Sequence, residues 1–390
     1  MAFYLQRNMR KIAVPKIFVN GLNAKSGGGK SILTNFLTLL ATKGSPYQFI
    51  VIVPNSYDYS IFSSSEIKII PMPIFSATLC IPFVNSFYLP FLVRKLKVDL
   101  IFNLADIPIP TNIKQIFLFD WPYAVYPNSP AWKLGDLKSF LIRKLKLFFF
   151  KKYLIYVDTI IAQSESIKRR LEIYYNLKFI KVIQNAVSVD NISANNIHDF
   201  KLGSGLKLLC LSYYYSHKNI EIFLPLAQII KAKGLNIKII TTIEAHHNKK
   251  ALIFLQKLKS ESLDKIIINI GSVPMSLVPS LYTQIDGLLL PTLLESFSGT
   301  YVEAMFHKKP IFTSNLDFAT DVCSDAAFYF DPYDANQILD RILECINEPI
   351  NKQIKIERGL EVLEKLPSWD QAFDKYIELF TMVLDIKNEP

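Results

Sequence analysis

The sequence has few cysteines, and those few lie far apart. Only four occur in 390 residues, at Cys80, Cys210, Cys323 and Cys345. This scatter gives neither a metal-binding spacing nor a disulfide framework, so it predicts buried thiols in a reducing compartment. The first residues, MAFYLQRNMRKIAV, also lack the apolar stretch of a secretory signal. Both absences predict a cytoplasmic protein.

Charged residues are missing from one long segment. None lies between Ile69 and Val93, a length that would cross a bilayer. Four prolines interrupt the segment, so we expect a buried strand, a loop and a helix there and no membrane span. The fraction of charged residues is only 20% and half of the residues are hydrophobic, which excludes a disordered chain.

Negative charge is scarce in the first half of the chain. Residues 1–190 hold 24 Lys and Arg against 10 Asp and Glu, a net charge of +14, whereas residues 191–390 have a net charge of −4. The first half is therefore expected to face an anionic partner or to present a solvated basic surface. No basic helix with base-reading residues is present, so we expect an anionic membrane surface and no nucleic acid. The segment Arg143–Val157 mixes basic and bulky apolar residues, as in an interfacial helix or a core helix with outward lysines.

Short apolar runs alternate with helix-length periodic segments, and this alternation predicts parallel sheets built from βαβ units. The fold class is therefore α/β, with two doubly wound, Rossmann-like domains that face a cleft. We expect an N-terminal domain at 1–190 and a polar linker at 191–205. A second domain at 206–370 follows, and a C-terminal helix at 371–390 is expected to pack back on the first domain.

The most informative segment is DGLLLPTLLESFSGTYVEAMF, residues 286–306. A buried strand leads into a loop with Glu295, and Ser298, Gly299 and Thr300 open a helix that carries Glu303. The free amides at a helix start form an anion site that suits a diphosphate. Glu303 in the second turn can accept two hydrogen bonds from the hydroxyls of a ribose. Glu295 lies where it can meet a sugar.

A glycine-rich segment, AKSGGGKS, follows the first predicted strand. Gly28 and Gly29 are interpreted as a turn beside the phosphates of a ligand. The same segment satisfies a loose phosphate-loop pattern, so a P-loop NTPase or kinase using Ala24–Ser31 is an alternative. That alternative requires a strand that ends in a magnesium-binding aspartate, and none is evident at the expected distance.

Asp120 ends a predicted strand and therefore lies at the expected cleft, where it can orient a substrate or simply cap a turn. No histidine precedes His198, so no histidine of the first domain is available for catalysis. The later ones, His217, His246, His247 and His307, show no metal-ligand spacing and are interpreted as surface or loop residues.

The segment ESFSGTYVEAM resembles the Glu-x7-Glu signature of the family-four retaining glycosyltransferases of the GT-B fold. The resemblance extends to IIAQSESIKRRLEIYY, VIQNAV, SHKNI and DAAFYFDPYD. It implies that Glu295 contacts the hydroxyls of the donor sugar, Glu303 the ribose, and Lys218 the diphosphate. The family commonly has an arginine five residues before this lysine. Tyr213 stands there in this sequence, so one of the two usual phosphate cations is missing.

The resemblance implies a retaining transferase that moves a sugar from a nucleoside diphosphate sugar to a glycan or lipid-linked acceptor, in surface polysaccharide synthesis. Glu295, Lys218 and Asp120 are the expected catalytic residues. No metal is expected, which agrees with the absence of an Asp-x-Asp motif. The further alternatives are a nucleotide-sugar epimerase on the same scaffold and a carbohydrate-binding protein without catalytic activity.

Overall fold

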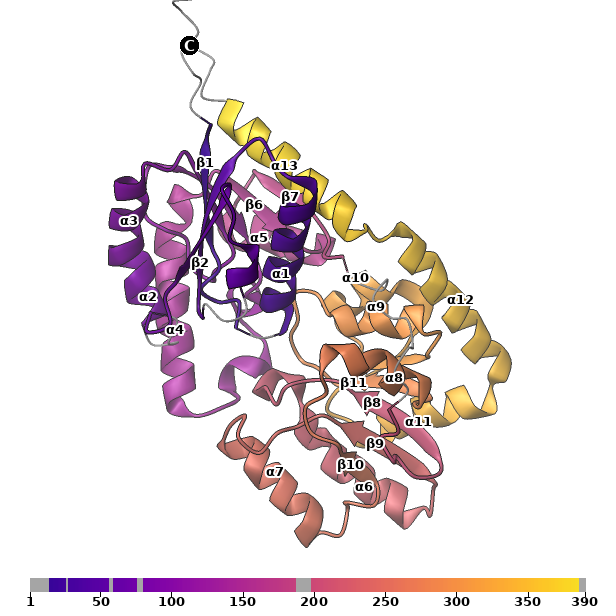
Figure 1. The fold of residues 1–390 in the computed structure, drawn as a ribbon. Coiled ribbons are helices and arrows are strands. Elements are labelled where there is room, and N and C mark those ends of the chain that lie inside the picture. The colour runs from indigo at the N-terminus through magenta and orange to yellow at the C-terminus, as the bar shows by residue number, and fades with distance from the viewer. Residues whose placement is uncertain (1–13, 26, 56–58, 76–79, 187–197, 386–390) are drawn as a thin grey trace, which may run out of the picture.

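Two parallel β-sheets form the framework of the protein (Figure 1). The computed structural model describes residues 14–25, 27–55, 59–75, 80–186 and 198–385. Helices connect successive strands on both sides of each sheet, so the expected fold class is confirmed. The described part of the linker, from residue 198, lies against the second domain, where the His198 backbone amide donates to Ser280 Oγ at 2.9 Å. Residues 191–197 of the linker lie outside the described part of the chain.

The first sheet has seven strands in the order β3-β2-β1-β4-β5-β6-β7. Its strands are short runs of β-branched, leucine and aromatic residues, buried on both faces as expected for a parallel sheet. Their bounds are β1 (Lys16–Asn20), β2 (Gln48–Val53), β3 (Ile67–Pro71), β4 (Leu100–Asn103), β5 (Lys114–Leu118), β6 (Thr159–Ala162) and β7 (Ile180–Val182).

Helices cover the two faces of the first sheet through alternate strand residues. On one face, α1 (Gly27–Lys43) packs against Val19 and Phe102. On the other face, α3 (Leu89–Leu96) packs against Phe18 and Ile101. The remaining helices of this domain are α2 (Ile81–Phe83), the π-turn η2 (Val84–Tyr88), α4 (Leu137–Tyr153) and α5 (Glu165–Tyr175).

The charge-free segment divides into the elements that the sequence predicted. Its described residues form the end of β3, α2, η2 and the first turns of α3, while residues 76–79 lie outside the description. None of the helices described in the structure combines the length and apolarity needed to cross a bilayer.

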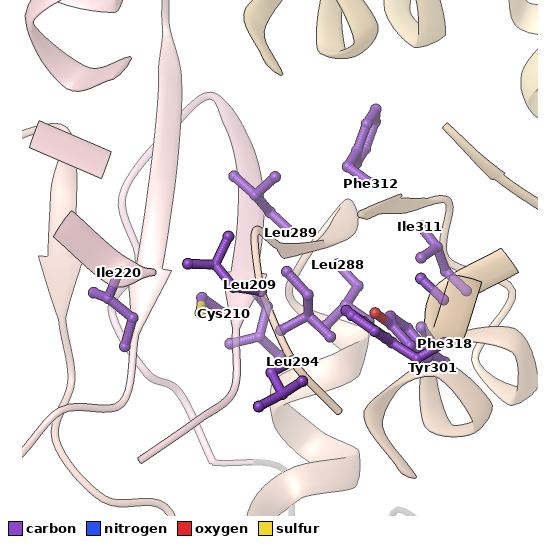
Figure 2. Packing of buried hydrophobic residues seen from close by; sticks show 14 of the residues in the cluster. Leu209, Cys210, Ile220, Leu288, Leu289, Leu294, Tyr301, Ile311, Phe312 and Phe318 are labelled. Carbon is purple, nitrogen blue, oxygen red and sulfur yellow. The ribbon is translucent and has the colours of Figure 1, made fainter. Parts of the chain in front are cut away.

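The second sheet has six strands in the order β10-β9-β8-β11-β12-β13, and Figure 2 shows the apolar side chains packed around it. Its strands are β8 (Leu206–Cys210), β9 (Ile237–Thr241), β10 (Ile267–Asn269), β11 (Gly287–Leu290), β12 (Ile311–Ser314) and β13 (Ala327–Phe330). Strand β13 was not predicted from the sequence. The helices are α6 (Phe223–Ala232), α7 (Lys249–Ser260), α8 (Val278–Thr283), α9 (Gly299–Phe306), α10 (Asp317–Cys323), α11 (Ala335–Asn347) and α12 (Pro349–Lys365).

The last helix, α13 (Trp369–Asp385), returns to the first domain and lies beside α1 (Figure 1). Its aromatic side chains enter the core of that domain. The ring centroids of Phe36 and Phe373 are 5.6 Å apart, and those of Phe102 and Phe380 are 5.1 Å apart. Because burial of each large aromatic ring contributes several kcal/mol, α13 holds the two domains in one unit.

Candidate active site

The carboxyl ends of the two sheets meet through a hydrogen bond between Asp120 and Ser296. Asp120 follows β5 of the first sheet and Ser296 follows β11 of the second, and Ser296 Oγ donates to Asp120 Oδ1 at 2.6 Å. Gln163, at the end of β6, donates to the same oxygen at 3.0 Å and in turn accepts from Asn185. Strand ends of both domains therefore converge on one carboxylate, as expected for ligand sites in doubly wound sheets.

Burial raises the pKa of the Asp120 carboxyl to about 6, and the negative charges of Asp106 and Glu295 act in the same direction. The hydrogen bonds from Ser296 and Gln163 oppose this shift. Asp120 is therefore ionised above about pH 6 and can then accept a further hydrogen bond.

Lys218 and Glu295 form an ion pair in the second domain. Lys218 ends the short 3-10 helix η6 (Ser216–Lys218) after β8, and Glu295 follows the neighbouring strand β11. Their side chains are only 16% and 11% exposed. Thr292 Oγ1 donates to the same carboxylate of Glu295 at 3.0 Å. The two predicted catalytic side chains of this domain are therefore in direct contact.

The local backbone explains the position of Lys218. Asn219 adopts the left-handed conformation with φ +55°, and its side-chain amide donates to the carbonyl of Pro332 at 2.7 Å. The carbonyl of His217 accepts from the backbone amide of Leu293 at 2.7 Å. The loops that follow β8 and β11 are thereby held together.

Helix α9 begins one turn after Glu295. Ser298 precedes it but makes no side-chain cap hydrogen bond to its first turn, and Ser298 Oγ lies 2.9 Å from Thr300 Oγ1. Gly299 is the first helical residue. Amides at such a helix start, together with the helix dipole, attract an anion.

Glu303 lies in the second turn of α9, where Tyr282 of α8 donates a hydrogen bond to it at 3.2 Å. The ring of Tyr282 stacks on His307 with centroids 4.7 Å apart and an interplanar angle of 4°. Burial raises the pKa of Glu303 to about 7, and the hydrogen bond from Tyr282 opposes part of that shift.

Aromatic rings gather where η6 approaches the first domain. His217 stacks on Tyr215 at 5.5 Å and meets the ring of Tyr123, from the first domain, edge-on at 5.9 Å. Tyr213 packs instead on His247, with centroids 4.3 Å apart. The interpretation of the histidines as surface or loop residues was wrong for His217, which is half-buried between the domains. Burial lowers the pKa of His217 to about 3, aided by the charges of Lys218 and Arg143, so this imidazole is neutral.

The glycine-rich segment forms the start of α1, which begins at Gly27, so Gly28 and Gly29 lie in the first turn of a helix and not in a separate turn. Gly27 has φ +58°, and a Cβ atom at Gly27 or Gly28 would meet nothing within 4 Å. A Cβ atom at Gly29 would lie 3.6 Å from the carbonyl oxygen of Asn23. The backbone here is open to a ligand. The strands beside β1 end at Val53 and Asn103, and Asp106, three residues beyond β4, pairs with Lys146.

An ion pair near Asp120, between Lys146 and Asp106, was not predicted from the sequence. Lys146 of α4 pairs with Asp106, which follows β4, and its ammonium lies 4.7 Å from the centroid of the Trp121 ring. Burial lowers the pKa of Lys25, and the positive charge of Lys146 adds to that effect, so both lysines belong to one region. The position of Asp106 just beyond a strand end was the one signal in the sequence.

No group of three or more His, Cys, Asp or Glu side chains is arranged to hold a metal ion within the residues that the structure describes.

Comparison with known families matches residues 198–361 to the family described as "Glycosyl transferases group 1". The match covers most of the second domain. Over 114 residues the chain is 27% identical to the O-antigen chain mannosyltransferase B of Escherichia coli, a match that covers 29% of this chain and 30% of the relative. It is 21% identical over 266 residues to the phosphatidylinositol N-acetylglucosaminyltransferase GPI3 subunit of Saccharomyces cerevisiae, covering 66% of this chain and 57% of the relative. The chain thus spans less than two thirds of either relative.

Solved structures similar to this chain have the GT-B fold. A glycosyltransferase from Rickettsia africae superposes with a TM-score of 0.70 at 18% identity, covering 95% of this chain and 99% of that one. Anabaena HepE, solved with UDP and glucose, gives 0.70 at 14% identity and covers 94% and 99% of the two chains. WaaG, a glycosyltransferase involved in lipopolysaccharide biosynthesis, gives 0.69 at 12% identity and covers 93% and 99%.

The raised pKa of Glu303 predicts that this carboxylate lowers the stability of the unliganded protein. A carboxyl with a raised folded-state pKa stabilises the fold below its unfolded pKa, and that contribution is lost as the pH rises through about 7. Glu303→Gln should therefore be more stable than the wild type at pH 8, by roughly 3 kcal/mol, with the difference shrinking below pH 7 and disappearing only below about pH 4. Thermal melts over this pH range measure it. Glu172→Gln, a change of an exposed residue on α5, is the control and should leave the profile unchanged. A Glu303→Gln protein that is less stable than the wild type at pH 8 would contradict the assignment.

Proposed function

We propose that the protein is a retaining glycosyltransferase that moves a sugar from a nucleoside diphosphate sugar to a glycan or lipid-linked acceptor, in surface polysaccharide synthesis on the cytoplasmic side of a membrane. The observation that carries the proposal is the grouping of Lys218, Glu295, Glu303 and the start of α9 on two neighbouring strand ends of the matched domain. The names of the relatives and the UDP and glucose bound by HepE support the donor and acceptor classes.

In this proposal the donor lies along the carboxyl end of β11. The ribose hydroxyls donate to Glu303, and the diphosphate meets the amides of Gly299 and Thr300. Lys218 is close enough to Glu295 to pair with it, so a bound diphosphate would share the lysine with that carboxylate. Glu295 then has its second oxygen for hydroxyls of the donor sugar. The open backbone at Gly28 and Gly29 borders the donor from the first domain.

The protein contributes positioning and electrostatics to the transfer step. As the bond between sugar and diphosphate breaks, negative charge grows on the leaving oxygen, and Lys218 and the α9 amides stabilise it. The anomeric configuration is retained if the leaving oxygen takes the proton of the acceptor hydroxyl, which then attacks the face of the sugar from which the diphosphate departs. Asp120, on the first domain, orients a hydroxyl of the substrate. Its hydrogen bond with Ser296 of the second domain forms only when the two domains are close together, so this role requires domain closure. Phosphate charge is met by protein groups in this scheme, so no metal ion is required.

The proposed role of Lys218 predicts a selective loss on substitution. Lys218→Ala should lower turnover by about one to two orders of magnitude, because a charged hydrogen bond contributes roughly 1.5–3 kcal/mol. It should also weaken binding of a nucleoside diphosphate by a similar factor while leaving the affinity for the free nucleoside unchanged. Calorimetry and steady-state kinetics with UDP and GDP donors measure both effects.

The contact with Glu295 requires controls for stability. Loss of the lysine leaves a mostly buried carboxylate unpaired, so melting of Lys218→Ala is compared with that of Lys218→Ala combined with Glu295→Gln. Lys259→Ala on the exposed end of α7 is the control for charge alone. If diphosphate and nucleoside affinity fall together in a folded Lys218→Ala protein, the phosphate role is wrong and the lysine acts only on the fold.

The proposed chemistry also predicts the stereochemistry of the product. The new glycosidic bond should have the anomeric configuration of the donor sugar, and EDTA should leave the rate unchanged. Proton NMR of the first product formed, with and without EDTA, measures both. A product of inverted configuration would refute retention, and a rate abolished by EDTA and restored by a divalent cation would refute metal independence.

A further inference from the structure

Two exposed apolar stripes run along the outside of the first domain. Phe83, Phe87 and Phe91 on the α2–η2–α3 segment are 52%, 70% and 61% exposed. On α4, Leu137, Leu141, Leu145 and Phe148 are 73%, 57%, 38% and 57% exposed. The residues of each stripe are three or four apart, so they lie on one side of their helix.

The two stripes lie on neighbouring helices of one layer. Ile101 of β4 packs against α3 and is the register partner of Gln115 on β5. Phe117 lies two residues after Gln115, so its side chain is on the same face of the sheet, and it contacts Phe150 of α4. Helices α3 and α4 therefore cover the same face. The rings of Phe83 and Phe149 lie 6.3 Å apart, which joins α2 to α4. In Figure 1, α2, α3 and α4 lie together on one side of the first domain, away from α12 and α13. We call this surface the α3–α4 face: the outward sides of residues 81–97 and 137–153.

The charge of the α3–α4 face has one sign. Residues 81–97 and 137–153 contain nine Lys and Arg and no Asp or Glu. A comparable apolar stripe at Ile346, Ile350 and Ile354 in the second domain, 47%, 78% and 49% exposed, lies among mixed charges. Residues 335–365 around it contain six acidic and five basic residues. Apolar exposure occurs on both domains. Helix α7 also combines exposed Leu252 and Ile253 with four lysines and no acidic residue, but the α3–α4 face has the larger group of exposed apolar side chains.

The structure corrects one part of the expectation for the Arg143–Val157 segment. Arg143 does not face outward, because its guanidinium donates to the carbonyl of Trp132 at 3.0 Å and also bonds to that of Leu134. Lys146 is turned inward as well, to Asp106. The lysines on the other sides of α4, such as Lys151 and Lys152, are exposed. Helix α4 thus has an inner side toward Asp120 and an outer, apolar and basic side.

We propose that the α3–α4 face docks on an anionic lipid bilayer. Exposed phenylalanine and leucine side chains would enter the boundary between headgroups and acyl chains, and the lysines and arginines would contact lipid phosphates. A second copy of the chain is the less favourable occupant, because pairing through this face would place the exposed positive charges of one copy against those of the other. Docking does not depend on the proposed function. If that function holds, α4 also places Lys146 and Asp120 next to the membrane, where a lipid-linked acceptor is held.

Flotation of the full chain with lipid vesicles tests the docking. The wild type should float with vesicles containing phosphatidylglycerol, not with phosphatidylcholine alone, and release as salt rises. Phe87→Glu combined with Leu137→Glu should reduce the bound fraction at least tenfold. Ile350→Glu, at an equally exposed apolar position of the second domain, is the matched control and should bind like the wild type.

Three outcomes would overturn the docking. These are a wild type that does not float with anionic vesicles, equal losses in the double variant and the Ile350→Glu control, and a lipid-free dimer that the double variant converts to monomer. The last would show that a second copy covers the face. Thermal melts and donor turnover with a soluble acceptor should be unchanged in the double variant. Lys218→Ala should still float, so failure of docking and failure of the proposed function are separable.

Discussion

The ion pair between Lys218 and Glu295 is the interaction on which the candidate site depends. It joins the loops after β8 and β11, two neighbouring strands of the second sheet, and both side chains are less than a fifth exposed. Each charge in such a position needs a partner, because an unpaired charge at low exposure costs several kcal/mol. The pair therefore fixes both charges between the loops that follow β8 and β11. A site preorganised in this way needs little rearrangement to meet charge that develops on a substrate.

Besides the ring contact between Tyr123 and His217, hydrogen bonds join the first domain to the second near this site. Asp120 accepts from Ser296, the residue next to Glu295. Farther along the junction, Asp317 accepts from Tyr126 at 2.9 Å and from Arg170 at 2.8 Å, and the guanidinium of Arg170 lies 3.8 Å from the ring centroid of Tyr126. The first contact lies at the proposed reaction centre and the second lies beside it. Together with α13, they explain how two separate sheets present one set of side chains.

Much of the fold could be predicted from the sequence, because each buried parallel strand is a short apolar run followed by a helix-length period. Helix α9 begins where the sequence predicts it, at Ser298–Thr300. The start of α1 lies within the glycine-rich segment, where glycines give no side-chain pattern for a boundary. Strand β13 was not predicted.

The candidate site was only partly predictable. Lys218, Glu295 and Glu303 stood out because strand ends and a helix start mark such positions in sequence. The partners that shape them come from distant segments: Gln163 and Asn185 reach Asp120, and Tyr282 reaches Glu303. His217 was misplaced because its burial arises from the opposite domain, which no local pattern encodes. The outward and inward sides of α4 likewise became distinct only once Lys146 was seen to pair with Asp106.

A crystal structure of the protein with bound UDP or GDP tests the central claim most directly. The account predicts the ribose hydroxyls at Glu303, the diphosphate between Lys218 and the amides of Gly299 and Thr300, and the glycines of α1 beside its distal phosphate. A nucleotide held by Gly27–Ser31 alone, with its phosphates remote from Lys218, would contradict it and favour the P-loop alternative.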